Sequence, residues 1–352
     1  MRIGVPKEIK PLEGRVGLIP AACAELVRFG HPVFVEKSAG NNSGYPDERY
    51  RAVGVEVLDS AAEVFDKAEM IVKVKEPIAG DLEHLRKEHL LFCYLHLAAI
   101  PELTESLKEI GLTAVAFETV ADELGRLPLL APMSDIAGRL AIQVATHLLH
   151  QPQGGKGILL GGIPAATRGK VVILGGGVAG SNSAIVAAGL GAEVTVFDVS
   201  RDKLVAARAL GPNVTGLYPH TADVSDAVAD ADIVVGAVLV TGERAPHVVS
   251  REMVARMQPG GVIADISVDQ GGCVETTVPT TYDDPTYVEE GAIHFTVTNM
   301  PGAVPRTASQ ALSAAIAPYV ARLARDDWRE EQELVRGINV EAGKVVHPAL
   351  FK

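Results

Sequence analysis

Short apolar runs alternate along the chain with longer segments in which apolar residues recur every three or four positions. The short runs are rich in β-branched residues and predict strands, while the longer segments predict helices. In the first part of the chain, strands are expected at 2–6, 33–36, 70–75, 90–96 and 112–118, and helices at 20–29, 81–88 and 101–110. Strands that alternate with helices indicate a mostly parallel sheet.

The same alternation returns after a long helix predicted over 134–150 and a loop over 151–169 rich in Gly and Pro. Strands are then expected at 171–174, 193–197, 233–238, 261–266 and 293–298, with helices at 178–189 and 201–210. A second long helix is predicted over 307–325, and the charged segment after Trp328 shows no clear period. The expected fold class is α/β, with two doubly wound domains linked by long helices.

Charge and cysteine content narrow the function classes. The chain of 352 residues has 32 Lys+Arg against 44 Asp+Glu, a net charge of −12. This argues against binding to nucleic acid, which depends on an excess of Lys and Arg. The three cysteines, Cys23, Cys93 and Cys273, lie far apart and without metal-ligand spacing. We expect buried thiols in a reducing cytoplasm and no metal site.

One uncharged stretch, from Val171 to Ala192, is long enough to suggest a membrane span. It has glycines in its middle, however, followed by Ser181-Asn182-Ser183. A strand, a turn and a helix in succession explain it better. The N-terminal segment mixes charge with Pro and lacks the apolar core of a signal peptide. We therefore expect a soluble, cytoplasmic protein that does not contact membranes.

The glycines of that stretch form a motif. Lys170–Leu174 leads into Gly175-Gly176-Gly177-Val178-Ala179-Gly180, which fits G-x-G-x-x-G. Gly175 permits a tight turn, Gly177 lets a pyrophosphate approach the backbone, and Gly180 allows close packing of helix on strand. Asp198 ends the next expected strand, where it can accept from a ribose 2′-hydroxyl and would repel a 2′-phosphate. NAD is thus favoured over NADP, although Arg201 and Lys203 weaken the preference.

This motif in its context predicts a Rossmann dinucleotide-binding domain over 131–304, inserted into a substrate domain formed by 1–130 and 305–352. A glycine-rich turn that merely packs well is the structural alternative. FAD shares the fingerprint, but it usually occupies an N-terminal βαβ unit, whereas this unit begins at residue 170.

Polar residues at the expected strand ends are candidates for chemistry. Lys73 and Lys75 would share one face of a strand, and Tyr94 and His96 one face of another. A histidine is a ready acid and base for a carbonyl or amine reaction. The alternatives are a solvated edge of lysines and a histidine satisfied by backbone groups in the core.

Three further segments carry candidates. Arg15 lies on a loop flanked by glycines, where a guanidinium can clamp a carboxylate, or it is simply a surface arginine. Asp265 and Asp269 end a strand at the edge where ligands bind, or they provide ordinary turn chemistry. Ser134 and Asp135 could cap the long helix.

Short motifs that follow one another in a fixed order carry a family resemblance. They are Gly4-Val5-Pro6-Lys7-Glu8, Gly14-Arg15-Val16, Lys73-Val74-Lys75-Glu76-Pro77, Tyr94-Leu95-His96-Leu97-Ala98, Leu130-Ala131-Pro132-Met133-Ser134, Gly175–Gly180 with Asp198, Val268-Asp269-Gln270-Gly271-Gly272 and Asn299–Thr307. Together they resemble the bacterial L-alanine dehydrogenases, a family similar to the soluble NAD-binding part of proton-translocating transhydrogenase. The resemblance extends over nearly the whole chain and favours the functional interpretation of Arg15, Lys75 and His96.

The resemblance implies a role for each motif. Arg15 and Lys75 would bind the substrate carboxylate, His96 would act as acid and base, and Asp269 would orient the reacting groups. Tyr94 and Asn299 would line the substrate side. The residues implied to hold NAD, two of which also have the roles just given, are Ser134, Gly175, Gly177, Val178, Ala179, Gly180, Asp198, Lys203, His220, Val238, Leu239, Ile266, Ser267, Asp269, Asn299 and Met300. His220 departs from the small polar residue usual in the family.

The implied activity is NAD-dependent oxidative deamination of L-alanine to pyruvate and ammonia, together with the reverse reductive amination. Two alternatives remain open at this stage: an NAD(H)-binding module of a transhydrogenase, and a dehydrogenase for another amino acid. The resemblance also implies a homohexamer.

Overall fold

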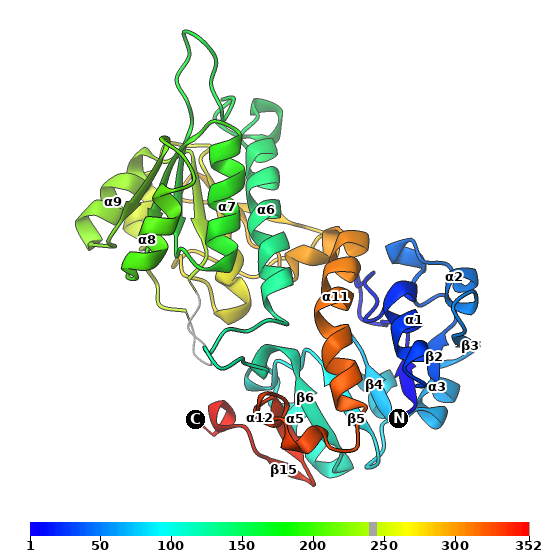
Figure 1. Ribbon diagram of the computed structural model, residues 1–352. Coiled ribbons are helices and arrows are strands. Elements are labelled where there is room, and N and C mark those ends of the chain that lie inside the picture. Colours follow the sequence, from blue (N-terminus) through cyan, green and yellow to red (C-terminus); the bar gives the residue numbers. More distant parts are fainter. Residues whose placement is uncertain (239–244, 352) are drawn as a thin grey trace. The chain divides into compact units, whose positions relative to one another are not determined.

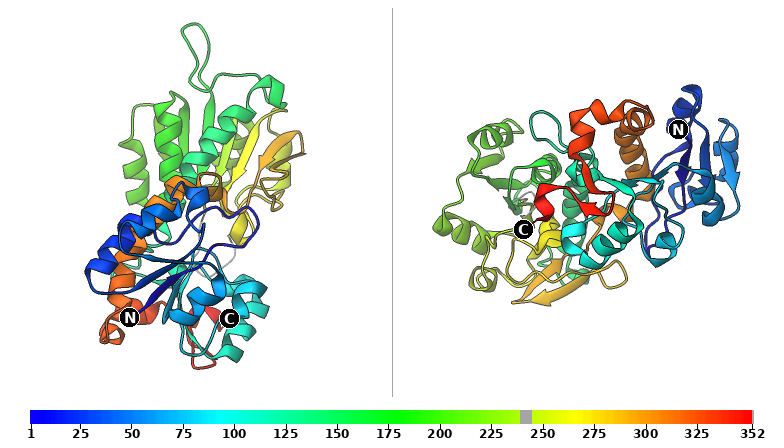
Figure 2. Two further views of the ribbon diagram at one scale, coloured as in Figure 1. Left: turned by 90° about the vertical axis from the view of Figure 1, so that its right-hand side faces the viewer. Right: turned by 90° about the horizontal axis from the view of Figure 1, so that it is seen from below.

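The computed structural model describes residues 1–238 and 245–351. The chain divides into two compact units, one formed by Met1–Met133 with Val304–Lys352 and the other by Ser134–Ala303. Each unit is built on one sheet covered by helices (Figures 1 and 2). Within the described residues, no helix is both long enough and apolar enough to cross a membrane.

The first unit contains an eight-stranded sheet in the order β15-β14-β6-β5-β4-β1-β2-β3. The parallel strands are β1 (Ile3–Val5), β2 (Val33–Glu36), β3 (Glu56–Leu58), β4 (Met70–Val72), β5 (Leu90–Cys93) and β6 (Thr113–Ala116). Antiparallel strands β14 (Ile338–Glu341) and β15 (Lys344–Val345) extend one edge. The strand order reverses between β1 and β4, and ligands of such sheets bind beyond the carboxyl ends of the strands at this point.

The helices of the first unit are α1 (Pro20–Arg28), α2 (Asp47–Arg51), α3 (Ala61–Lys67), α4 (Ala79–Leu82), α5 (Pro101–Ile110), α11 (Pro305–Leu323) and α12 (Gln332–Arg336). Although α11 is remote in sequence, it packs against α1 (Figure 1). Two of its serines bind the loop after β1: Ser309 Oγ accepts from Val16 N at 3.0 Å, and Ser313 Oγ accepts from Ile19 N at 3.0 Å.

The second unit contains a seven-stranded sheet in the order β12-β13-β11-β10-β7-β8-β9. Its strands are β7 (Lys170–Leu174), β8 (Glu193–Phe197), β9 (Val214–Leu217), β10 (Ile233–Gly236), β11 (Val262–Asp265), β12 (Thr286–Glu289) and β13 (Ala292–Phe295). All pairs are parallel except β12 with β13. Without β12, this is the strand order of a Rossmann fold, so the expected fold class is confirmed.

Helices cover both faces of this second sheet, namely α6 (Ala131–Leu148), α7 (Val178–Gly189), α8 (Arg201–Arg208), α9 (Thr221–Asp230) and α10 (Arg251–Ala255). Val171 and Ile173 of β7 join a core with apolar residues of α6 and α7. Val172 and Leu174 join a separate core with residues of α9 and α10. Burial on both faces explains why residues 171–174 of β7 are all apolar, since strands of parallel sheets lack the polar face of half-exposed ones.

Two strands that carry candidate residues end earlier than expected. The strand expected over 70–75 ends at Val72, because the carboxylate of Glu8 takes the Val74 N–H at 2.7 Å. The strand expected over 90–96 ends at Cys93, because the Glu118 carboxylate binds the N–H groups of Leu95 and His96. Lys73 and Lys75 therefore do not share a strand face, and neither do Tyr94 and His96.

Helix boundaries also differ from the expectation. The long helix expected from Ser134 begins at Ala131, so Ser134 and Asp135 are inside its first turns and do not cap it. The helix expected over 81–88 is reduced to Ala79–Leu82, where Asp81 accepts from the Ile78 N–H. Elements that the periodicity did not predict are α2, α3, α9, α10 and α12 and strands β3, β9, β12, β14 and β15. Most of them are short, and β14 forms by pairing with the distant β6.

Candidate functional site

The candidate residues of the first unit follow the carboxyl ends of strands on either side of the strand-order reversal. Arg15 follows β1, Lys75 follows β4, and Tyr94 with His96 follows β5. Parallel strands end at the same edge of a sheet, so residues far apart in sequence meet there. Carboxylates lie at the same edge, and they form hydrogen bonds and ion pairs with the candidate residues.

Arg15 is buried, with a relative exposure of 2%, so it is not a surface arginine. Glu13 accepts from Arg15 Nε at 2.7 Å and from Nη2 at 2.5 Å, a bidentate pair. Arg15 Nη1 also lies 3.2 Å from Met133 Sδ. Burial by itself would raise the pKa of Glu13, but the bonds from Arg15 outweigh it and lower that pKa. The pair therefore presents a fixed guanidinium to this edge of the sheet.

Lys75 is half-buried and lies near two of the carboxylates, since its charge helps to lower the pKa of both Glu13 and Glu76. Its neighbour Lys73 is 1% exposed and pairs with Glu8 at 3.3 Å and Asp81 at 3.2 Å. Burial by itself would lower the pKa of Lys73, but these two carboxylates raise it. Lys73 thus anchors the segment after β4 from inside, and Lys75 is the lysine placed nearer to solvent.

His96 is held through both its backbone and its ring. Its φ of 50° is in the left-handed region, which is uncommon for a residue with a side chain. Glu118 stabilises this turn by accepting from the N–H groups of Leu95 at 3.0 Å and His96 at 2.6 Å. The ring nitrogen Nδ1 lies 3.3 Å from Glu76 Oε2, while 35% of the side chain is exposed. A buried carboxylate on one side and solvent access on the other suit a proton-transferring histidine.

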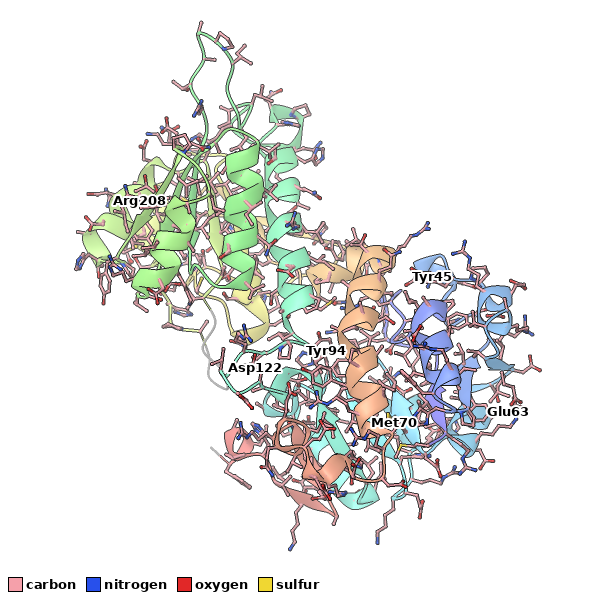
Figure 3. The ribbon with its side chains drawn as sticks, viewed as in Figure 1. Tyr45, Glu63, Met70, Tyr94, Asp122 and Arg208 are labelled. Atoms are coloured by element: carbon pink, nitrogen blue, oxygen red, sulfur yellow. The ribbon has the colours of Figure 1, made fainter. Side chains whose placement is uncertain are left out.

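Tyr94 is labelled in Figure 3; its ring lies against one face of the His96 ring. The two rings stack with centroids 5.9 Å apart, and Tyr94 contacts Phe117 edge to face at 5.0 Å. Its hydroxyl donates to Leu129 O at 2.6 Å, and burial raises the pKa of the phenol. Tyr94 therefore stays neutral and acts as a wall of the site.

The glycine-rich loop of the second unit begins directly after β7, at the strand-order reversal. Gly175 has a φ of +95°, and a Cβ at Gly180 would lie 1.8 Å from the Gly175 carbonyl oxygen. Among the described residues, no atom outside the neighbouring backbone lies within 4 Å of a Cβ built at Gly177, which leaves room for a ligand at the N-terminus of α7. A helix N-terminus with an open backbone suits a pyrophosphate, so the loop fits the expected dinucleotide.

Asp198, at the end of β8, is buried and already accepts several bonds. Oδ2 accepts from Gly176 N at 2.7 Å and lies 3.3 Å from Lys203 Nζ, whereas Oδ1 accepts only from Ser200 N, at 2.8 Å, among the bonds described. Each carboxylate oxygen has two lone pairs, so Oδ1 retains capacity for a ribose hydroxyl. Asp198 thus holds the glycine loop and suits an adenosine ribose.

Asp269 lies on a short 3-10 helix, η5 (Ile266–Gln270), and is exposed. Asp265, fully buried at the end of β11, organises this segment: it accepts from the N–H groups of Ser267, Cys273 and Val274. Thr277 Oγ1 also donates to Asp265, at 2.7 Å. Asp265 is therefore the structural acid of this strand end, and Asp269 is the one placed to meet a ligand.

The other candidates for the cofactor occupy loops of the same unit. Ser267 Oγ donates to Val238 O at 2.8 Å, which ties two of these loops together. Asn299 has a φ of 65° and precedes η6 (Met300–Ala303), where Met300 is buried. His220 is exposed and contacts the Tyr218 ring at 4.9 Å. Leu239 lies outside the described residues.

Sequence reasoning did not identify Glu13, Glu76 and Glu118 as residues that position these groups. It named Asp265, but not as the residue that organises the segment after β11. Glu13 and Glu76 lie within two residues of Arg15 and Lys75, so local spacing contained a signal for them. Glu118 follows a different strand from His96, and no local pattern could have paired them. Among the described residues, no group of three or more His, Cys, Asp or Glu side chains is arranged to hold a metal.

Comparison with known proteins decides the family. The domain model described as "Alanine dehydrogenase/PNT, N-terminal domain" matches residues 4–137, and the corresponding C-terminal domain model matches residues 141–348. The chain belongs to the alanine dehydrogenase/PNT family. The family resemblance expected from the sequence motifs is thereby confirmed.

Individual relatives of this family are similar over their full length. An alanine dehydrogenase of Bacillus subtilis is 47% identical, over 100% of this chain and 94% of its own. An alanine dehydrogenase of Methanococcus maripaludis is 46% identical, and the similarity covers 100% of this chain and 96% of that protein. A solved L-alanine dehydrogenase superposes with a TM-score of 0.96 at 50% identity, covering 99% of this chain and 98% of its own. A solved transhydrogenase from Sinorhizobium meliloti superposes with a TM-score of 0.86 at 27% identity, covering 99% of this chain and 100% of its own.

Proposed function

We propose that this protein is an alanine dehydrogenase, which converts L-alanine and water to pyruvate and ammonia with NAD as hydride acceptor, and catalyses the reverse reductive amination. The observation that carries the proposal is the arrangement of Arg15, Lys75 and His96 at one strand edge of the first unit. Alanine dehydrogenases at 44–47% identity over nearly the whole chain support it.

The carboxylate of the substrate is bound by two cations in this proposal. The ion pair with Glu13 holds the Arg15 guanidinium in place, and Lys75 adds a second positive charge near Glu13. An oriented amino acid reacts faster because its translational and rotational freedom is already lost on binding. A pocket sized for a methyl group discriminates by only about 1–3 kcal/mol per methylene, so glyoxylate and slightly larger keto acids are expected as poorer substrates.

The NAD that the glycine loop and Asp198 would hold would supply the hydride acceptor for the alanine Cα. The substrate is then an imine, and His96 serves its hydrolysis: the ring takes a proton from the attacking water and returns it to the leaving ammonia. Asp269 orients the reacting groups, and Asn299 lies with it on the cofactor side. His96 has one ring nitrogen at Glu76 and the other available for this exchange.

NAD rather than NADP is the proposed cofactor. The Asp198 carboxylate would repel a 2′-phosphate, and Lys203, which lies 3.3 Å from it, is 48% exposed and only partly offsets its charge. The residues proposed to hold NAD are Ser134, Gly175, Gly177, Val178, Ala179, Gly180, Asp198, Lys203, His220, Val238, Leu239, Ile266, Ser267, Asp269, Asn299 and Met300. A preference of at least about tenfold in kcat/KM is expected, since each 1.4 kcal/mol of repulsion gives that factor.

The deciding experiment mixes the purified protein with L-alanine and NAD and follows NADH absorbance. Wild-type protein should form NADH, and the His96→Ala variant should lose turnover by about 10²–10⁴-fold while it still binds NADH. Wild-type turnover in that variant would refute the assignment. NADH binding without alanine-dependent reduction would favour a transhydrogenase module, the class of the Sinorhizobium meliloti structure.

A panel of keto acids with ammonia and NADH tests substrate identity in the reductive direction. Pyruvate should have the highest kcat/KM, and a larger keto acid in that place would indicate a dehydrogenase for another amino acid. We further propose that the protein works in the cytoplasm as a homohexamer.

A further inference from the structure

Glu76 is a buried acid that the proposed chemistry does not use. Its side chain is 5% exposed, and its two oxygens have different partners. Oε1 pairs with Lys10 Nζ, and Oε2 lies 3.3 Å from His96 Nδ1. Burial by itself would raise the pKa of Glu76, but its bonds with His96 and Lys10 outweigh this and lower the pKa, so the carboxylate is charged.

A charged carboxylate only accepts hydrogen bonds. The neutral imidazole must therefore direct Nδ1–H at Glu76, which leaves Nε2 without a proton. Glu76 and Tyr94 contact the His96 ring, and Glu118 fixes the His96 backbone, so the orientation of the ring is restrained. The other charged or titratable groups near this pair are Lys10, Lys75 and Cys93.

We propose that Glu76 is a positioning residue, which selects the His96 tautomer with the proton on Nδ1 so that Nε2 can take a proton from water. The proposal rests on the assigned role of His96. Lys10 completes the device, because an ammonium has donors and no acceptor. It holds one oxygen of Glu76 and directs the other at the ring.

This geometry makes a Glu76→Gln variant diagnostic. Lys10 can only donate, so the new amide must turn its oxygen toward Lys10 and its NH2 group toward His96. The NH2 group donates to Nδ1 and forces the proton onto Nε2, which disables the base. We expect kcat for alanine oxidation to fall by about 10²–10⁴-fold, the usual value of general base catalysis. KM for L-alanine should change much less than kcat, because the Arg15–Glu13 pair that binds the substrate carboxylate is untouched.

The double variant Glu76→Gln/Lys10→Met separates this role from structural damage. Without Lys10 the amide is free to turn, and its oxygen can accept from Nδ1–H again. We expect kcat to recover by at least about tenfold over the single variant, part of the loss attributed to general base catalysis. A merely structural role for Glu76 predicts that the second substitution adds to the damage. A Glu76→Gln variant as active as wild type, or a double variant no better than the single one, would overturn the proposal.

Two further variants keep the test sharp. Glu76→Asp retains an acceptor-only group and should exceed Glu76→Gln in kcat, even if the latter folds poorly; equal losses would contradict the proposal. Glu105→Gln makes the same chemical change at an exposed ion pair with Lys108, and should leave kcat unchanged. If wild-type protein forms no NADH from L-alanine, the proposed function fails; if His96→Ala is inactive and Glu76→Gln is active, only the role of Glu76 fails.

Discussion

At the residue scale, buried acids organise the strand ends that carry the cationic and proton-transferring groups. Glu13 fixes Arg15, and Glu118 fixes the backbone of His96. Asp265 does the same for the segment that carries Asp269. An unpaired buried charge is costly, so each acid holds its partners in one geometry. The net charge of −12 thus includes acids that shape a cationic site.

The Glu13–Arg15 pair predicts a pH-dependent contribution to stability. Glu13→Gln should destabilise the protein by about 3–5 kcal/mol near neutral pH, because it removes the charge of the carboxylate that forms a bidentate pair with the buried Arg15. The folded-state pKa of Glu13 is lowered from 4.5, so its contribution is complete above that pH and is lost as the pH falls through the lowered pKa. Urea unfolding of both proteins from pH 8 to 3 measures this. The difference should be constant above about pH 5 and shrink progressively as the pH falls below 4.5; a difference as large at pH 3 as at pH 8 would contradict the prediction.

The three thiols should be unreactive in the folded protein. Cys23, Cys93 and Cys273 are buried, as their separation in the sequence suggested, and burial raises the pKa of each, that of Cys23 to about 12. Thiolates are the reactive form, so a disulfide reagent at pH 8 should modify none of them in native protein and all of them in urea. Rapid labelling of native protein would show that one of these sites opens.

At the element scale, the N-terminus of α7 shapes the proposed cofactor site, and helix α11 supports the loop that carries Arg15. The loop before α7 combines one glycine with positive φ, one position open to a ligand and one close backbone approach. Helix α11 supplies Ser309 and Ser313 to the loop that carries Arg15. Helix α7 therefore contributes open space beside its backbone, and α11 contributes hydrogen bonds to the backbone of the loop that carries Arg15.

Alanine at Gly177 tests the ligand space. A Cβ there meets no atom of the part of the chain that the structure describes, and the φ of −70° suits any residue, so Gly177→Ala should fold with near-normal stability. It should weaken NADH binding by at least about tenfold, or 1.4 kcal/mol, because the methyl group occupies the path of the pyrophosphate. Gly189→Ala in the same helix, where a Cβ likewise meets no atom of the described residues, is the matched control. Fluorescence titration with NADH compares the two, and equal affinities would exclude the pyrophosphate from this loop.

Removal of the Ser309 hydroxyl tests the link between α11 and the Arg15 loop. Ser309→Ala leaves the Val16 N–H without its acceptor and takes one partner from Ser43, a loss of about 1–3 kcal/mol in unfolding free energy. KM for L-alanine should rise as the loop loosens, with a smaller effect on kcat. Ser106→Ala on α5 removes a solvent-exposed hydroxyl contact and should change neither quantity. An unchanged KM in Ser309→Ala would show that the loop is held without α11.

At the scale of the whole molecule, both units are built on the same strand order. In each, the order reverses between the first and fourth strands, and the candidate residues lie beyond the carboxyl ends beside that point. One unit carries the cations and His96, and the other carries the glycine loop and Asp198. A single topological rule therefore locates two different chemistries.

The homohexamer proposed from the family resemblance can be tested directly. Light scattering on the purified protein should give a mass six times the 37.0 kDa of one chain. The mass should be unchanged across a tenfold range of protein concentration. A stable monomer or dimer with full alanine-dependent turnover would refute the homohexamer and leave the proposed activity standing.

The sequence by itself determined the alternation of strands and helices, the glycine loop with Asp198, and the identity of the residues proposed for chemistry. Local patterns suffice for the elements and the glycine loop, because periodicity and turn residues act over a few positions. The roles proposed for Arg15, Lys75 and His96 came from the family resemblance of the motifs that contain them. Tertiary structure decided the rest. His96 was singled out as a residue on a strand face, yet it lies in a left-handed turn that Glu118 stabilises from another strand. Likewise β14 exists through its pairing with β6, and Glu76 gains its meaning from Lys10 and His96. Contacts between distant segments satisfy buried charges and backbone groups, and a one-dimensional pattern contains no record of which segments meet.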